Sequence, residues 1–267
     1  MNEYRITQDL HCHSVCSVCC HDPTHTAEAI LRHAEACGFS AIALTDHVWD
    51  EGIAVTEERY RIQNIKNSRR NLPLPVSANG VRILFGCETE YLGGDGISLL
   101  PTHYGIFDWI LVAVNHFMPG FFCPEDCRTP AQKYRLQLAR LEKLVTLPLP
   151  WEKIGIAHLS YFAPEDGAQG ADYDRAFLET ADRRRAVFEM LAAHGAGMEL
   201  NPTVFRGGNE ERIRAELWEA KAAGLRFYCG SDAHSRDGLD RIFTLRPKAI
   251  LPLGLREKDR FVPPALR

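Results

Sequence analysis

Two histidines one residue apart stand near the start of the chain, in the segment Asp9–His13 (DLHCH). Side chains of an extended segment alternate between faces with a period of two, so His11 and His13 point the same way and can reach one cation or two adjacent cations. Histidine and acidic residues recur later in short polar motifs, each after a short apolar run. These later motifs are Thr45-Asp46-His47, Gly86-Cys87-Glu88, Asn115-His116, Ala157-His158 and Gly230-Ser231-Asp232-Ala233-His234.

Eight residues of these motifs are candidate metal ligands, because imidazole and carboxylate groups suit Zn, Mn and Fe. The eight are His11, His13, His47, Glu88, His116, His158, Asp232 and His234. Taken singly, each has an ordinary alternative, such as a hydrogen-bonded surface histidine or a carboxylate that caps a helix. Together they include six of the eleven histidines, a grouping that independent placement does not explain. Eight ligands exceed the needs of one ion, so we predict two or three divalent ions with Glu88 as a bridge.

Short apolar runs alternate with helical patterns along the chain and predict the elements that position these residues. Strands are expected at Ile6–His11, Ala41–Leu44, Val81–Phe85, Trp109–Val114, Ile154–Ala157, Gly197–Leu200 and Arg226–Tyr228. Helices are expected at Thr26–Cys37, Pro130–Thr146, Arg175–His194 and Glu210–Ala223. This alternation, with nearly continuous apolar strands, indicates a parallel sheet covered by helices.

The positions of the polar residues favour a closed or nearly closed barrel over an open sheet. Seven of them are expected just past the ends of seven different strands: His11, His47, Glu88, His116, His158, Asn201 and Asp232. In a β/α barrel these strand ends converge on one mouth, where catalysis takes place. Segments 71–79 and 247–267 are rich in proline or charge, and we expect both at the surface.

Length and composition restrict the class of protein. A chain of 267 residues suits one large domain, and 31 basic against 35 acidic residues give a net charge of −4. A nucleic-acid partner is therefore not indicated, although it stays possible. The chain has no apolar stretch of membrane-span length and no signal-peptide core at its start, so we expect a cytoplasmic protein without a membrane partner. Nine cysteines in such a protein favour free thiols or metal ligands over disulfides.

The ordered set of motifs resembles the PHP (polymerase and histidinol phosphatase) family from Asp9 to His234. The pieces Asp-Leu-His-x-His, Leu-Thr-Asp-His and Gly-Ser-Asp-Ala-His are specific in combination. The resemblance implies a distorted (β/α)7 TIM-like barrel in a single domain over 1–267, and the composition of 247–267 predicts that this segment is a C-terminal surface extension. The resemblance also implies a di- or trinuclear Zn, Mn or Fe site that hydrolyses phosphoesters, with the eight candidates as ligands.

Two further assignments follow from this resemblance. Trinuclear members carry a ninth ligand soon after the His-x-His motif, where this chain has Cys19, with His21 and Asp22 close by. The stretch Glu199–Arg206 resembles the part of histidinol-phosphate phosphatases where an arginine follows a strand-end asparagine, so Arg206 is a candidate phosphate ligand. The alternative for Arg206 is an arginine in a surface ion pair.

The predicted reaction is metal-dependent hydrolysis of a phosphoester by a metal-bridging hydroxide at the C-terminal mouth of the barrel. The substrate is a small-molecule phosphomonoester such as histidinol phosphate, or a nucleotide phosphoester, and no separate acid or base is assigned. One alternative is an amidohydrolase-like enzyme acting on C–N or ester bonds, and another is a catalytically silent PHP-like metal-binding domain. A third is a radical SAM cluster on Cys12, Cys16 and Cys19, which leaves the later histidines unexplained.

Overall fold

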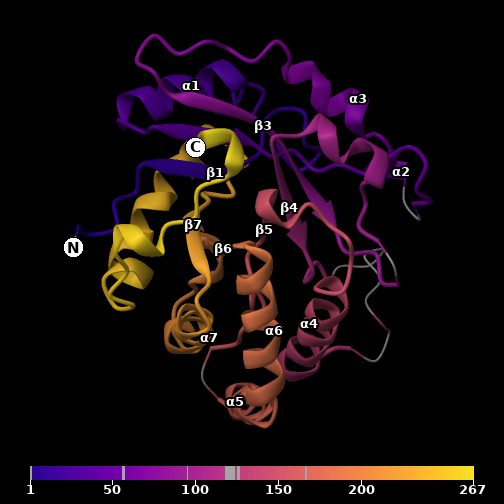
Figure 1. The fold of residues 1–267 in the computed structure, drawn as a ribbon, viewed down its shortest axis with the longest axis vertical. Coiled ribbons are helices and arrows are strands. Elements are labelled where there is room, and N and C mark those ends of the chain that lie inside the picture. Colours follow the sequence, from indigo (N-terminus) through magenta and orange to yellow (C-terminus); the bar gives the residue numbers. More distant parts are fainter. Residues whose placement is uncertain (1, 56–57, 95, 118–123, 125–126, 166) are drawn as a thin grey trace.

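A computed structural model describes residues 2–55, 58–94, 96–117, 124, 127–165 and 167–267. Within these residues, seven parallel strands are paired in chain order (Figure 1). They are β1 (Gln8–Cys12), β2 (Ala41–Leu44), β3 (Arg82–Glu90), β4 (Trp109–Ala113), β5 (Ile154–Ile156), β6 (Gly197–Leu200) and β7 (Arg226–Cys229). The prediction of a distorted β/α barrel in one domain is confirmed. Each predicted strand is present, with exact bounds for Ala41–Leu44 and Gly197–Leu200 and shifted boundaries for the others.

The barrel closes at its C-terminal mouth through the segment that follows β7. The amide of Asp232 donates to the carbonyl of His11 at 2.7 Å, and the amide of His13 donates to the carbonyl of Ala233 at 3.1 Å. The ends of β1 and β7 are thereby joined by backbone hydrogen bonds, which bring the first and last polar motifs of the chain side by side.

Helices cover the outside of the barrel. Their bounds are α1 (Ala27–Ala36), α2 (Glu58–Arg61), α3 (Ile65–Ser68), α4 (Pro130–Leu144), α5 (Ala168–Glu179), α6 (Ala181–His194) and α7 (Glu210–Ala222). In Figure 1, α1 and α3 lie on the side of the first strands, whereas α4 to α7 lie along the later strands. No helix in the described part of the chain is long and apolar enough to cross a membrane.

The single helix predicted over Arg175–His194 is wrong, because the chain forms α5 and α6 there. Thr180 separates them with φ −107° and ψ 10°, outside the helical region. Its buried hydroxyl donates to the carbonyl of Ala176 at 2.8 Å. A Thr hydroxyl that bonds the preceding turn competes with helix continuation, so the chain breaks at this residue.

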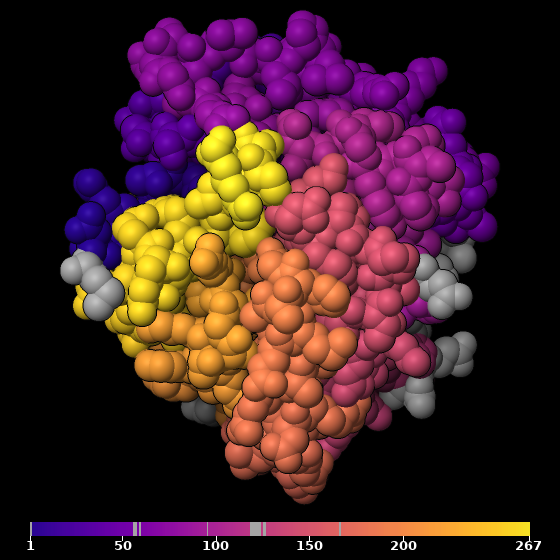
Figure 2. Space-filling model, in the orientation of Figure 1, coloured from indigo at the N-terminus to yellow at the C-terminus, as the bar shows by residue number. Residues whose placement is uncertain are grey.

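The C-terminal segment 247–267 is largely packed against the barrel rather than forming the surface extension that was expected. Phe261 is buried with Trp109 and Tyr228, in a cluster of apolar side chains separate from the larger core beneath the helices. The amide of Phe261 donates to the carbonyl of Phe227 at 2.7 Å, and the side chain of Gln8 donates to the carbonyl of Phe261. Figure 2 shows this segment in contact with its neighbours on the visible face. Apolar residues spaced among charges in the tail account for the difference.

Trp109 fills much of the barrel interior at the end that the C-terminal segment covers. A Cβ at Gly155, on β5, would collide with the Trp109 ring, so glycine is required at that position. The indole nitrogen of Trp109 donates to the carbonyl of Leu10 at 2.9 Å, and its ring lies edge-on to Tyr228 with centroids 5.1 Å apart. The interior is thus filled by side chains, as in other β/α barrels, and the open end is the mouth.

Candidate metal centre

The predicted ligands converge at a cleft of about 510 Å³ at the C-terminal ends of the strands. Six of them line it directly: His47, Glu88, His116, His158, Asp232 and His234. His11 and His13 are fully buried at its base. His11 and Glu88 lie inside β1 and β3 rather than past their ends as predicted, because β3 continues to pair with β4 up to Glu90.

The most deeply buried candidates form an inner group of His11, His13, Glu88 and Asp232. The Nε2 atoms of the two histidines are 3.2 Å apart. Each Nε2 lies 3.4–3.5 Å from Glu88 Oε2 and from Asp232 Oδ1. A tetrahedral ion with bonds of about 2.1 Å separates adjacent ligand atoms by about 3.4 Å. These spacings therefore fit residues arranged around a shared divalent cation.

Glu88 faces two different sets of histidines with its two carboxylate oxygens. Oε1 lies 2.9 Å from His158 Nε2 and 3.9 Å from His116 Nε2. Oε2 lies 3.0 Å from His47 Nδ1 and is also the oxygen that faces His11 and His13. A carboxylate placed in this way can join two adjacent cations, which is the bridging role expected from the sequence.

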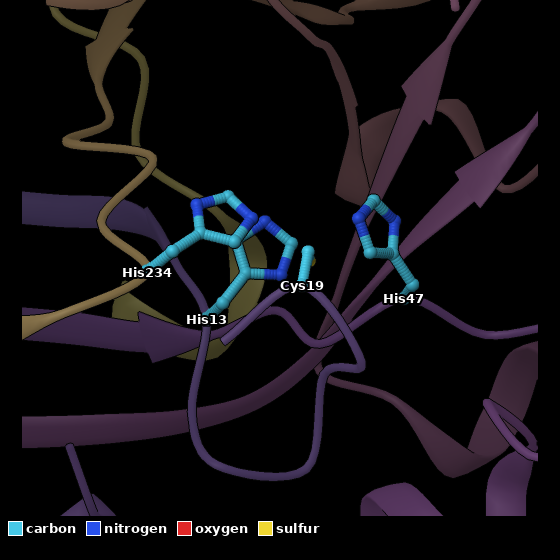
Figure 3. A group of neighbouring side chains, drawn as sticks. All are labelled: His13, Cys19, His47 and His234. Carbon is cyan, nitrogen blue, oxygen red and sulfur yellow. The ribbon is translucent and has the colours of Figure 1, made fainter. Parts of the chain in front are cut away.

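A third group of potential ligands lies at the outer side of the cleft. His13, Cys19, His47 and His234 each offer one ligand atom, and these atoms all lie within 4.8 Å of one another (Figure 3). The rings of His13 and His234 are stacked, with their centroids 4.1 Å apart. The structure thus brings Cys19 into the candidate site, whereas Asp22 is used by the loop itself and His21 lines the cleft without joining this group.

Two glutamates that sequence reasoning did not assign hold the candidate ligands in place. Glu199 Oε1 accepts from His11 Nδ1 at 2.8 Å, and Glu199 Oε2 accepts from the amide of His158 at 2.6 Å. Glu90 Oε1 accepts from His116 Nδ1 at 2.7 Å. A hydrogen bond to the second ring nitrogen fixes the orientation and basicity of a ligating histidine. Period-two alternation could have found both residues, since Glu90 and Glu199 stand two positions from Glu88 and Asn201.

Two candidate ligands have backbone conformations that non-glycine residues rarely adopt. His158 has φ +28° and Asp232 has φ +53°. Such positive φ angles are costly and tend to occur at functional sites, where surrounding contacts enforce them. Here the side chain of Asn115 contacts His158 twice. Its Oδ1 accepts from the His158 ring at 3.0 Å, and its Nδ2 donates to the His158 carbonyl at 2.6 Å. These backbone conformations direct both side chains into the cleft.

Burial and neighbouring charges shift the pKa values of the candidate ligands in different directions. Burial opposes a charge on His13, but hydrogen bonds to Asp232 and Glu88 raise its pKa to about 9. Burial likewise opposes a charge on His116, and Glu90 raises its pKa to about 9. Burial and the nearby His13 lower the pKa of His234 to about 4. Imidazoles bind metals in the neutral form, so cations would replace the protons on His13 and His116.

Arg206 lies at the edge of this region. Its side chain is exposed, and its guanidinium carbon lies 4.2 Å from the centroid of the Tyr161 ring. Tyr161 itself lines the cleft, and Arg206 does not. Asn201, in contrast, is buried and donates to Glu199 at 3.2 Å and to Asp232 at 3.4 Å. A phosphate-binding role for Arg206 stays a prediction.

The radical SAM alternative does not agree with the positions of the three cysteines. Cys12 is buried in the core beneath the helices, where its sulfur contacts His25 Nε2 at 3.8 Å. The thiol of Cys16 is also buried and points to Asn71 Oδ1 at 3.6 Å, whereas Cys19 lines the cleft. The three thiols therefore face different surroundings rather than one cluster.

Comparison with known proteins decides the family. The model of the PHP domain matches residues 9–231, which ends one residue before Asp232. The chain belongs to the PHP domain family. This PHP protein is accordingly a metal-dependent phosphoesterase, as its ligand motifs predicted. No curated protein matches its sequence.

Solved structures resemble this PHP protein in fold. One is histidinol phosphate phosphatase from Lactococcus lactis subsp. lactis Il1403, complexed with Zn, L-histidinol and phosphate. It has 17% identity, a TM-score of 0.61 and coverage of 96% of this chain and 99% of that chain. Another is the putative histidinol phosphatase from Listeria monocytogenes, with 14% identity, a TM-score of 0.63 and coverage of 89% and 98%. At these identities the likeness concerns the fold.

Proposed function

We propose that this PHP protein hydrolyses a small-molecule phosphomonoester, of which histidinol phosphate is one example, with two or three divalent cations. The observation that carries the proposal is the placement of Glu88, whose two carboxylate oxygens face different sets of histidines at the base of the cleft. The inner cation would be held by His11, His13, Glu88 and Asp232, and a neighbouring one by Glu88, His116 and His158. Zn, Mn and Fe all suit this donor set.

When bound, the cations supply Lewis-acid activation of a water nucleophile and neutralise charge on the phosphoryl oxygens. The protein's own residues keep the ligands in place: Glu199 orients His11, and Glu90 orients His116. Lys133 lines the same cleft and provides a positive charge for a phosphate. Arg206 stays a candidate for a second phosphate contact, because Tyr161 beneath its guanidinium forms part of the cleft wall.

The remaining walls of the cleft suit a compact organic group. Trp49 and Tyr60 are stacked with ring centroids 5.8 Å apart on one wall, and Tyr161 and Phe162 also line the cleft. The cleft volume of about 510 Å³ lies within the range of small-molecule sites. The structural neighbour complexed with L-histidinol and phosphate supports a substrate of this size. The cytoplasmic location expected from the sequence belongs to this proposal, and the free thiols of the described cysteines support it.

Phosphate release from three substrates tests the proposal directly. The protein would be stripped with a chelator, reconstituted separately with Zn, Mn or Fe, and assayed with histidinol phosphate, a nucleoside monophosphate and a phosphodiester. We expect hydrolysis of monoesters by at least one reconstituted form and none by the stripped protein. Faster cleavage of the diester would contradict the monoester assignment, and turnover by the fully stripped protein would contradict metal dependence.

A further inference from the structure

The last residue of β1 and the loop after it contain four cysteines, and their side chains have different surroundings. Cys12 and Cys16 are buried, with their thiols directed to His13 or His25 and to Asn71. The thiol of Cys20 points to the carbonyl of Asp22 at 3.8 Å. Among these four described cysteines, only Cys19 lines the cleft. Its thiol is thus available to the site, and those of the other three are engaged elsewhere.

The fold places the Cys19 side chain among three imidazole rings. Its sulfur and one ring nitrogen each of His13, His47 and His234 lie within 4.8 Å of one another. Figure 3 shows the short Cys19 side chain between His47 on one side and His13 and His234 on the other. Zinc–sulfur bonds of about 2.3 Å and zinc–nitrogen bonds of about 2.0 Å place such ligands about 3.5 Å apart. Small side-chain movements would bring this group to that spacing.

We propose that this PHP protein binds its outermost cation through the thiolate of Cys19 together with the imidazoles of His47 and His234. The inference rests on the proposed function for the presence of a metal centre, and it adds the chemical identity of one ligand. A thiolate in this position favours thiophilic cations such as Zn²⁺, Co²⁺ and Cd²⁺ over Mn²⁺ and Mg²⁺.

His13 is assigned to the inner cation because it has one ring nitrogen to offer. Its Nδ1 is hydrogen-bonded to the Ser17 hydroxyl at 2.9 Å. Its Nε2 faces the inner ligands, 3.4 Å from Glu88 Oε2 and 3.4 Å from Asp232 Oδ1. The outer group therefore consists of one thiolate and two imidazoles, which leaves a fourth position for a water or a phosphoryl oxygen in a tetrahedral site.

The other two sequence candidates for this ligand fit less well. Asp22 Oδ1 accepts from the amide and hydroxyl of Thr24 at 2.9 and 2.6 Å, and Asp22 Oδ2 accepts from the amide of Arg236 at 3.1 Å. Both oxygens of this carboxylate are thus used in hydrogen bonds that close the loop. His21 is exposed and lines the cleft, but it does not belong to the group of mutually close ligand atoms.

The backbone that carries Cys19 is held in place on both sides. Asp46 Oδ1 accepts from the amide of Ser14 and from the hydroxyl of Ser17, both at 2.7 Å. The amide of Val18 donates to Gln63 Oε1 at 2.9 Å, and the amide of Cys20 donates to the carbonyl of Ser17 at 3.0 Å. These contacts pre-organise the thiol toward His47 and His234 before any cation binds.

Substitution with Co²⁺ gives a readout that does not depend on catalysis. A cobalt–thiolate bond produces an intense near-ultraviolet charge-transfer band, and cobalt–imidazole or cobalt–carboxylate bonds do not. The full-length protein would be stripped and titrated with CoCl₂ as wild type and as Cys19→Ser and Cys20→Ser variants. Cys37→Ser is a necessary control, because Cys37 lies near His33 and Asp240 and could bind cobalt independently.

We expect the charge-transfer band in the wild type, in C20S and in C37S. C19S should lose the band and should also bind one equivalent of cobalt less. Far-ultraviolet circular dichroism of C19S would verify its fold. As a second measurement on the wild type, Zn²⁺ should slow alkylation of Cys19 and leave that of Cys20 unchanged.

Three results would overturn the inference: no band in the wild type, an unchanged band in C19S, or alkylation of Cys19 that Zn²⁺ does not affect. Phosphate release measured on the same preparations separates this inference from the proposed function. Hydrolysis without the band would leave the phosphoesterase standing and reject the thiolate ligand. The band without hydrolysis of any phosphoester would support the thiolate ligand and reject the proposed function.

Discussion

Glu199 links two candidate ligands from beneath the site. It accepts from the ring of His11 at 2.8 Å and from the amide of His158 at 2.6 Å, and it is almost fully buried. Glu199→Gln keeps the shape of this side chain but removes the charge that holds His11 in one orientation. We expect the affinity for Zn²⁺ to fall by about 10–100-fold, as is typical for such supporting residues. Competition with a chromophoric chelator measures the change.

The exposed Glu189 on α6 provides a matched control, since Glu189→Gln makes the same chemical change far from any ligand. Unchanged Zn²⁺ affinity in E189Q and weakened affinity in E199Q would support the positioning role. Equal affinities in the wild type and E199Q would contradict it.

A second buried carboxyl group, Glu216 on α7, makes folding stability depend on pH. Burial raises its pKa to about 7 from the ordinary value of 4.5. Because its folded-state pKa is raised, the folded state binds a proton more tightly than the unfolded state. The stability gained from this protonation is full below about pH 4.5 and is lost as the pH rises through 7.

Glu216→Gln should therefore stabilise the protein more at pH 8 than at pH 4.5, by on the order of 3 kcal/mol. Urea unfolding of wild type and E216Q at both pH values measures this difference. Glu211→Gln on the same helix, where the carboxylate is 90% exposed, makes the same chemical change at the surface and serves as the control. An E216Q effect that does not vary with pH would contradict the assignment.

At the scale of single residues, the sequence predicted which side chains gather at the cleft, but it did not resolve the loop that follows the His-x-His motif. His11, His13 and the strand-end residues could be placed because strand periodicity and barrel topology constrain where such side chains point. Cys19, His21 and Asp22 could not be separated, because a loop has no period. Their roles depend on long-range hydrogen bonds, such as those from Ser14 and Ser17 to Asp46.

At the scale of elements, the strands were predicted well and two of the connecting segments were not. Most strands contain a short buried apolar run, whose pattern is local to the sequence. The break at Thr180 depends on hydrogen bonds of one side chain within a continuous helical pattern, so periodicity predicts a single helix there. The packing of 247–267 depends on apolar side chains from distant strands, which come together only once the barrel has formed.

The C-terminal segment leads to a prediction about its own role. Phe261 is 3% exposed and packs against Trp109 and Tyr228 at ring-centroid distances of 5.2 and 6.4 Å. Phe261→Ala removes these contacts and leaves a cavity, so the free energy of unfolding should fall by about 3–5 kcal/mol. Because Gln8 and Gly197, at the starts of β1 and β6, contact Phe261, this cluster lies away from the mouth.

Bound-metal content should therefore be unchanged in folded F261A. Phe243→Ala, at a position 40% exposed, serves as the control and should cost much less. Chemical denaturation gives the stabilities, and elemental analysis gives the metal content. Similar losses in both variants would show that the C-terminal segment is not part of the core.

At the scale of the whole molecule, the two ends of the barrel have separate tasks. Apolar and aromatic side chains fill the interior and the end closed by Phe261, whereas the candidate ligands gather at the mouth, where the strands end. This division is typical of β/α barrels, in which the C-terminal face carries function and the remainder provides stability. A cation that binds only the folded protein also stabilises it by mass action.

Glu88 connects this architecture with the proposed chemistry, because its two carboxylate oxygens face different sets of histidines. Metal content and phosphate release, measured on the same preparations of wild type and Glu88→Gln, test the central claim most directly. We predict at least two metal equivalents in the wild type, loss of at least one in E88Q, and a fall in kcat/KM of at least about 10³-fold, or about 4 kcal/mol of transition-state stabilisation. Wild-type metal content and turnover in a folded E88Q protein would contradict the account.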